Sequence, residues 1–249
     1  EILTRDYDVI IFKHCFPVSN IEEDEEVADI NSYHKSIANY KLQYEAIKKK
    51  IVFLELEPGS VINEGALQTE LELGRTPIRE ALQRLEWEQL VTIVPRRGNF
   101  VTEISINDLH QIFELRLETE ALATRLAAQR GTAEHWEKMA RILAIHDWEA
   151  ATDQALINID EACHHIIYDA ADNRFLQETL TTHYTLSLRL WYLFLHRIGD
   201  MRTAVREHQQ ICECLRQRDA DEAVHLMEQH IQRFQTEIQA VMLGASARH

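Results

Sequence analysis

The stretch Gly74–Leu85 reads GRTPIREALQRL and decides the fold of the first half of this chain. It predicts a helix over about 76–88, because Thr76 is able to cap a helix start and Pro77 lacks the N–H that a first turn leaves unbonded in any case. Its apolar residues recur at spacings of three and four, which predicts one buried face made of Ile78, Leu82 and Leu85. The stretch therefore indicates an amphipathic helix with arginines at its start.

Those arginines, Arg75 and Arg79, lie where the recognition helix of a helix-turn-helix presents side chains to the major groove of DNA. An arginine there bridges O6 and N7 of guanine or binds phosphates, and the helix start itself favours a phosphate. The competing interpretation is that both arginines only decorate a solvated helix. The flanking elements favour the first interpretation.

Upstream, an apolar stripe at helical spacing precedes a break at Pro58-Gly59, and a further helix is expected over about 64–71. The stripe consists of Tyr40, Tyr44, Ile47 and Ile51. Downstream, the β-rich segments 91–94 and 99–102 predict a two-stranded hairpin. Its tip holds Arg96 and Arg97 beside the flexible Gly98, which suits a wing that reaches the DNA backbone or minor groove.

This order of elements resembles the GntR family of transcription regulators. The matching segments are Leu56–Gly59, Gly74–Leu82, Leu85-Glu86, Leu90-Val91 and Arg97-Gly98. The resemblance implies a winged helix-turn-helix over 41–103 in which four positions hold operator DNA: Arg75, Thr76, Arg79 and Gly98. The sequence departs from the family at Gly65, where an arginine is common, and at Glu72 and Gly74, where a glycine and a serine are usual. These departures bear on the strength of DNA binding rather than on the fold.

The rest of the chain predicts a mainly α protein of two domains. Its 249 residues include only seven glycines and four prolines, which favours long helices over many short strands. Beyond Ser105 we expect an all-α antiparallel bundle with helices at 106–130, 133–148, 152–171, 174–197, 202–217 and 220–243. The expected organisation is an N-terminal extension of unassigned role (1–40), the winged helix-turn-helix (41–103), an effector-binding and dimerisation domain (104–243) and a tail (244–249). Within the extension, Tyr7–Phe12 predicts a short strand, and Glu22–Glu26 forms an acidic run.

The net charge of −15 has the wrong sign for a protein that coats nucleic acid non-specifically. Residues 41–103, however, hold nine Lys and Arg against ten Asp and Glu, while residues 104–249 hold fourteen against twenty-two. The acidic excess therefore lies outside the expected DNA-binding domain. Such a distribution favours docking by one face over general adhesion to DNA.

A second resemblance covers about 106–243 and links the helical part to the FadR C-terminal domain (FCD) class of GntR regulators. The class resemblance implies an all-α domain that binds an effector and, in many members, a divalent metal on one Asp and three His. The matching positions are Asp160, His164, His208 and His230.

The spacing of these residues supports the match. Asp160 and His164 are four apart and share a helix face. His208 and His230 are equidistant from the turn expected at Arg218-Asp219, so they lie opposite each other if the two helices form an antiparallel hairpin. Three imidazoles and one carboxylate suit Zn²⁺, Ni²⁺ or a similar ion. The alternatives are ordinary packed histidines and a competing thiol at Cys212, and two further histidines, His165 and His225, do not fit the pattern.

Arg116 lies on a largely apolar helix face together with Glu120. One interpretation is a structural Arg–Glu pair one turn apart. The other is that Arg116 grips the carboxylate of an effector beside the metal. The sequence leaves these two interpretations open.

Together these features predict a homodimeric, cytoplasmic, one-component sensor. A small organic acid would bind the metal-bearing bundle and change the affinity for double-stranded operator DNA. No apolar run is long enough to predict a membrane span, and the four cysteines form no secreted disulfide pattern. The alternatives are a metal-dependent hydrolase and a regulator-like protein that has lost DNA binding.

Overall fold

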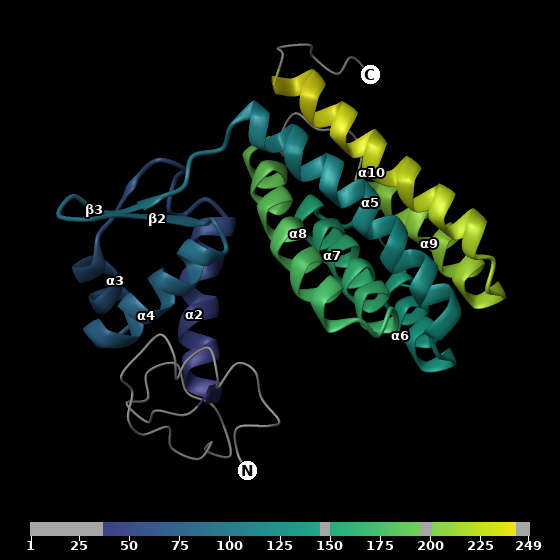
Figure 1. Ribbon diagram of the computed structural model, residues 1–249, viewed down its shortest axis with the longest axis horizontal. Coiled ribbons are helices and arrows are strands. Elements are labelled where there is room, and N and C mark those ends of the chain that lie inside the picture. Colours follow the sequence, from purple (N-terminus) through teal and green to yellow (C-terminus); the bar gives the residue numbers. More distant parts are fainter. Residues whose placement is uncertain (1–36, 145–149, 195–200, 243–249) are drawn as a thin grey trace. The chain divides into compact units, whose positions relative to one another are not determined.

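The computed structural model describes residues 37–144, 150–194 and 201–242. The chain divides between Glu103 and Ile104 into two compact units (Figure 1). The strand expected at Tyr7–Phe12 and the acidic run after it lie outside the described residues, as does the expected tail.

The N-terminal unit contains three described helices and a small sheet. The helices are α2 (Ile37–Val52), α3 (Glu64–Glu70) and α4 (Arg75–Trp87), and the strands are β1 (Val61–Ile62), β2 (Val91–Val94) and β3 (Gly98–Val101). The apolar faces predicted for the first and third helices meet in one core, where Ile47, Ile51, Ile78, Leu82 and Leu85 are at most 1% exposed. The winged helix-turn-helix expected from the sequence is therefore confirmed.

The sheet has three strands in the order β1-β3-β2, not the two that the sequence predicts. β3 pairs antiparallel with both neighbours, with Asn99 opposite Ile62 on one side and Ile93 on the other. The prediction missed β1 because a two-residue strand has no alternation pattern of its own and forms only against a partner. The second strand of the hairpin, β3, also begins at Gly98, one residue earlier than predicted.

The start of α4 corrects one prediction. Gly74, not Thr76, is the N-cap: it has an extended backbone (φ −68°, ψ 165°) and offers no side-chain cap. Thr76 is the second helical residue and is exposed. Pro77 still falls in the first turn, where helical N–H groups have no partner within the helix.

The C-terminal unit is an all-α bundle, as predicted. Its helices are α5 (Ile106–Arg130), α6 (Ala133–Leu143), α7 (Asp153–Ala170), α8 (Arg174–Phe194), α9 (Arg202–Gln217) and α10 (Ala220–Met242). α6 ends at Leu143 rather than near 148, with Ala144 as its C-cap. The ends expected for α6 and α8 reach into 145–149 and 195–200, outside the described residues.

Helix α7 is the central helix of the bundle. It packs against α5, α6, α8 and α9, while α10 lies along α5 and beside α9 (Figure 1). Ten of its residues are buried, and they include two polar ones, Asp160 and His164. In the part of the chain that the structure describes, no helix is long and apolar enough to cross a membrane.

Candidate metal centre and nucleic-acid interface

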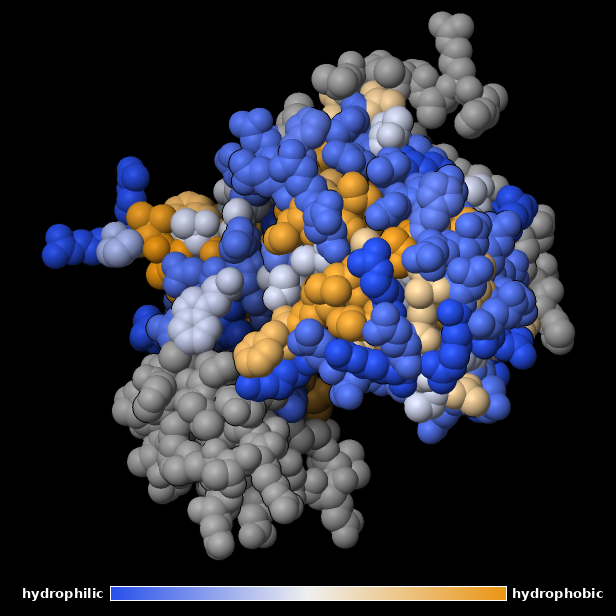
Figure 2. Space-filling model, turned by 45° about the vertical axis from the view of Figure 1, so that its right-hand side comes forward, coloured by the Kyte–Doolittle hydropathy of each residue, from blue (hydrophilic) through white to orange (hydrophobic). Residues whose placement is uncertain are grey.

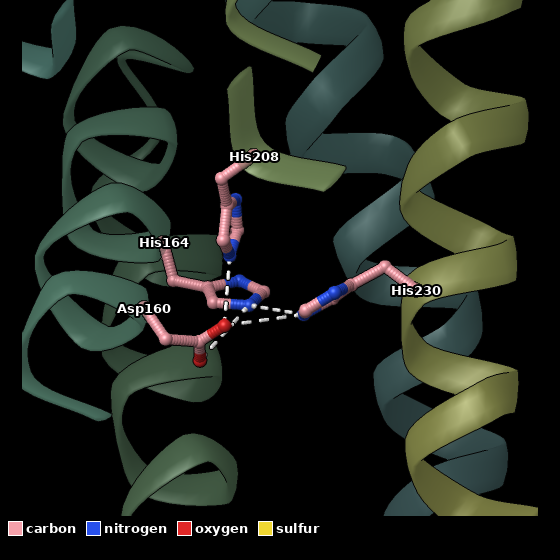
Figure 3. A group of neighbouring side chains, drawn as sticks. All are labelled: Asp160, His164, His208 and His230. Carbon is pink, nitrogen blue, oxygen red and sulfur yellow. Dashed lines mark hydrogen bonds and ion pairs between the residues drawn. The ribbon is translucent and has the colours of Figure 1, made fainter. Parts of the chain in front are cut away.

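Asp160, His164, His208 and His230 converge inside the helical bundle (Figure 3). Each offers one ligand atom, and these atoms all lie within 4.8 Å of one another. Asp160 and His164 come from α7, His208 from α9 and His230 from α10. All four side chains are at most 2% exposed. The structure thus brings together the four residues that the sequence singled out.

The turn between α9 and α10 sets the opposition of His208 and His230. Arg218 adopts a left-handed conformation (φ 59°) that ends α9, and the Asp219 side chain accepts a hydrogen bond from Glu222 N at 3.2 Å to begin α10. The chain therefore reverses direction between α9 and α10 at the turn that the sequence predicts. Antiparallel packing then places the two imidazoles opposite each other, with ring centroids 4.7 Å apart.

Three of the four candidate ligands have an orienting partner. Nδ1 of His164 lies 3.0 Å from Glu120 on α5, and Nδ1 of His230 lies 2.7 Å from Glu207 on α9. The hydroxyl of Tyr184 on α8 donates to Asp160 Oδ2 at 2.8 Å. Carboxylates on the outer nitrogen of an imidazole fix its tautomer and leave Nε2 free to bind a metal, which is the usual arrangement in histidine metal sites.

The donor set suits a divalent ion, and two of its atom pairs have the spacing of zinc ligands. Asp160 Oδ1 lies 2.9 Å from His208 Nε2 and 3.4 Å from His230 Nε2, and the Nε2 atoms of His164 and His230 are 3.4 Å apart. Ligand atoms about 2.0–2.1 Å from a tetrahedral zinc ion lie about 3.4 Å apart. If both Nδ1 atoms donate to their carboxylates and both rings are neutral, the Nε2 lone pairs of His164 and His230 face each other and could bind one cation between them.

The carboxylates around the centre are held ionised. Burial by itself raises the pKa of Asp160, but hydrogen bonds and charge from His208, His230 and His164 outweigh it and hold that pKa well below its usual range. In the same way the pKa values of Glu120 and Glu207 fall to about 2 despite burial. The site is therefore a buried cluster of imidazoles and ionised carboxylates, which are groups that bind positive ions.

The imidazoles differ in basicity. Burial lowers the pKa of His208 to about 4. Burial also disfavours the charged form of His230, but hydrogen bonds to Asp160 and Glu207 prevail and raise its pKa to about 9. A neutral His208 is ready to act as a ligand, whereas His230 must lose a proton to do so.

Arg116 forms a salt bridge with Glu120, which is one of the two interpretations that the sequence left open. Its Nη2 lies 2.8 Å from Glu120 Oε1, and both side chains are at most 3% exposed. Glu120 also accepts from the Tyr168 hydroxyl, and the Arg116 guanidinium lies 5.1 Å over the Tyr184 ring. Arg116 is thus linked to the centre through the partners of both His164 and Asp160.

The other candidates lie apart from the cluster. Cys212 points its thiol toward the Trp136 carbonyl at 3.9 Å, which makes it a packing residue. His165 pairs with Glu161, and His225 contacts Gln229. The sequence interpretation missed the roles of Glu207, Tyr168 and Tyr184, because nothing in local spacing reveals which residues of other helices face a given imidazole.

In the N-terminal unit, α4 presents Arg75 and Arg79 to solvent with side chains 68% and 53% exposed. Both face Glu64, the first residue of α3, whose Oε2 accepts from Arg79 Nε at 3.0 Å. Arg96 and Arg97 are exposed at the hairpin tip next to Gly98, whose φ of +116° is favourable only for glycine. These positions offer a basic helix start and a basic wing.

Comparison with known families matches both units. The family described as bacterial regulatory proteins, gntR family, matches residues 39–101, and the FCD domain matches residues 111–233. The Nta operon transcriptional regulator of Aminobacter aminovorans is 30% identical over 195 residues, which cover 78% of this chain and 91% of that protein. This chain is a GntR-family transcription regulator of the FCD type.

Further GntR-family relatives agree with this assignment. The transcriptional repressor RspR of Escherichia coli is 23% identical over 202 residues, covering 80% of this chain and 88% of that protein. Among solved structures, McbR/YncC of E. coli has the same fold with a TM-score of 0.73 at 20% identity, covering 82% of this chain and 98% of that one. The resemblances inferred from short motifs are therefore confirmed over most of the chain.

Proposed function

We propose that this GntR-family regulator is a homodimeric sensor whose affinity for operator DNA depends on a small organic acid bound at or near a divalent metal, Zn²⁺ or Ni²⁺. The observation that carries the proposal is the buried set Asp160, His164, His208 and His230, with ligand atoms within 4.8 Å of one another. Buried polar groups are costly unless they are hydrogen-bonded, paired or bound to a metal. Three imidazoles, two of them held by carboxylates, and one carboxylate are a typical set for these ions.

The effector side of the proposal rests on charge. A bound divalent ion supplies a positive centre that attracts a carboxylate. Arg116 lies on the neighbouring helix α5 and is buried, and the charge of Glu120 raises the pKa of its guanidinium in spite of burial. An acid that draws Arg116 away from Glu120 would also disturb the partner of His164. We therefore assign effector binding to Arg116 together with the metal.

The DNA side uses the residues at the start of α4 and in the wing. Arg75, Thr76 and Arg79 would contact base edges and phosphates in the major groove, and Arg96, Arg97 and Gly98 the backbone beside it. A dimer places two recognition helices on half-sites about one helical turn apart. The named relatives are transcription regulators, which favours this function over a metal-dependent hydrolase.

The test combines native mass spectrometry with DNA binding. We expect purified protein to carry one divalent ion per chain in a dimer. A DNA duplex is then selected from a random library with the protein, and its binding is measured by fluorescence anisotropy. We expect the affinity to change at least fivefold when the metal and the acid that the purified protein retains are added. His208→Ala should lose the ion, and His225→Ala, on α10 but outside the cluster, should keep it. A metal-free wild type with acid-independent DNA binding would refute the sensor, whereas rapid ester or amide hydrolysis by metal-loaded protein would favour the hydrolase.

A further inference from the structure

Glu64 is the point where three elements of the winged helix-turn-helix meet. Its Oε2 accepts from Arg79 Nε at 3.0 Å and lies 3.9 Å from Arg75 Nε, both on α4. Its Oε1 accepts from the Asn99 side-chain amide at 2.9 Å, on β3 of the wing hairpin. Glu64 itself is fixed in the first turn of α3, after the N-cap Asn63, whose side chain accepts from Ala66 N. One carboxylate therefore ties the recognition helix to the wing.

These contacts do little for folding stability. The Arg79 side chain is 53% exposed and the Glu64 side chain 23% exposed. Ion pairs on a surface contribute little, because water screens them and two long side chains lose freedom. The contact matters instead for where a flexible arginine points.

The bond to Glu64 uses the inner nitrogen of Arg79. Nε is engaged, and within the described residues neither terminal nitrogen makes a hydrogen bond, so both remain available. A guanidinium reads guanine by donating two parallel hydrogen bonds to O6 and N7. A carboxylate behind the guanidinium holds that planar group in one orientation before DNA arrives. Glu64 also lies between two like charges one turn apart, Arg75 and Arg79, and reduces their repulsion.

We propose that Glu64 is a positioning residue for operator recognition, which acts through Arg79 and sets the sequence preference of the recognition helix. The proposal rests on the function proposed above, in which Arg79 contacts operator bases. Its cost is a negative charge close to DNA phosphates, which weakens binding to DNA of any other sequence, whereas at the operator the positioned Arg79 more than offsets this repulsion. Specific and non-specific binding should therefore respond to its removal in opposite directions.

The test measures the ratio of dissociation constants for scrambled and selected duplexes, by fluorescence anisotropy with the full-length protein. The selected duplex comes from a random library enriched with the wild type. Glu64→Ala should lower the ratio by about tenfold, within the range of one bidentate arginine–guanine contact. Scrambled DNA should bind the variant up to a few times more tightly. Arg79→Ala should lower the ratio to a similar extent, and adding Glu64→Ala to it should change the ratio less than twofold.

Glu72→Gln is the matched control. Glu72 is exposed in the turn between α3 and α4, and no hydrogen bond to its side chain is found among the described residues. Its neutralisation should tighten binding to both duplexes equally and leave the ratio unchanged, with all variants melting near the wild type by circular dichroism. A wild-type ratio in Glu64→Ala, or a loss that persists in the Arg79→Ala background, overturns the positioning role. An unchanged ratio in Arg79→Ala instead overturns the proposed DNA contact on which it rests.

Discussion

At the scale of single residues, the helical unit depends on charges that have no access to water. Glu120 is fully buried and holds Arg116, His164 and Tyr168 at once. A buried ion pair adds little net stability, but removing one partner leaves the other charge uncompensated in a medium of low polarity. Glu120 is therefore a residue whose loss the fold tolerates poorly, even though it is no candidate metal ligand.

We predict that Glu120→Gln lowers the free energy of unfolding by about 3 kcal/mol, because the shape is kept while the buried Arg116 loses its counter-charge. Urea unfolding followed by circular dichroism measures this loss. Glu118→Gln, an exposed position on the same helix, should change stability by less than about 0.5 kcal/mol. Equal stability of the two variants would show that Arg116 does not need Glu120.

At the scale of elements, α3 is the helix in which this chain departs from its family. Its second residue is Gly65, exposed and next to Glu64, where the family often has an arginine. A glycine in this first turn supplies no positive charge. In the function proposed above, the cationic contacts with DNA therefore come from α4 and the wing.

We predict that Gly65→Arg raises the affinity for DNA. It should also steepen the slope of log affinity against log salt concentration by about one, as expected for one added phosphate contact. Anisotropy titrations at several salt concentrations give this slope. Gly65→Ala separates the backbone effect from the charge. Its added methyl group would lie 3.3 Å from Oδ1 of the N-cap Asn63, so it should change stability by less than about 1 kcal/mol and leave the slope unchanged. A flat response to Gly65→Arg would mean that the start of α3 does not approach the DNA.

At the scale of the whole molecule, two features concern partners rather than single contacts. The candidate metal centre joins α7, α9 and α10, with orienting residues from α5 and α8, so an ion there would link most of the bundle. In addition, the adjacent helices α5 and α8 carry exposed large apolar side chains: Leu115, Leu122, Phe175 and Leu193. Figure 2 shows apolar side chains gathered within a polar surround on the visible surface.

We predict that a chelator lowers the melting temperature of the protein by roughly 5–10 °C, because an ion present at about 100 times its Kd stabilises the folded state by about 2.7 kcal/mol. Calorimetry with and without the chelator measures the shift, and restoring Zn²⁺ or Ni²⁺ should reverse it. His208→Ala should melt at one temperature under both conditions, while His225→Ala should behave as the wild type. A shift that survives in His208→Ala would place the ion elsewhere.

We also predict that a second copy of the chain covers the apolar side chains of α5 and α8. Leu122, 42% exposed, is a suitable probe: Leu122→Glu should convert the dimer to monomer, since a charge buried without a partner is costly. Sedimentation equilibrium gives the mass. Gln129→Glu adds the same charge at an exposed position of α5 and should leave the dimer intact. A dimeric Leu122→Glu would point to another interface.

The sequence by itself determined the two-part, mainly α fold, because helix periodicity, breakers and the short motifs of α4 and the wing are local. The resemblance to the FCD class pointed to the four residues of the candidate metal centre, and two features of the sequence supported it: the spacing of four within α7 and the equal distances from the turn at Arg218.

Only the tertiary structure decided which groups face these residues. Glu120, Glu207 and Tyr184 come from helices far apart in the sequence, and the strand β1 exists only because β3 lies beside it. The contact of Glu64 with Arg79 and Asn99 likewise joins α3, α4 and β3. Periodicity tells which face of a helix is buried, but the identity of its neighbours depends on how the elements pack, and packing is set by the whole chain at once.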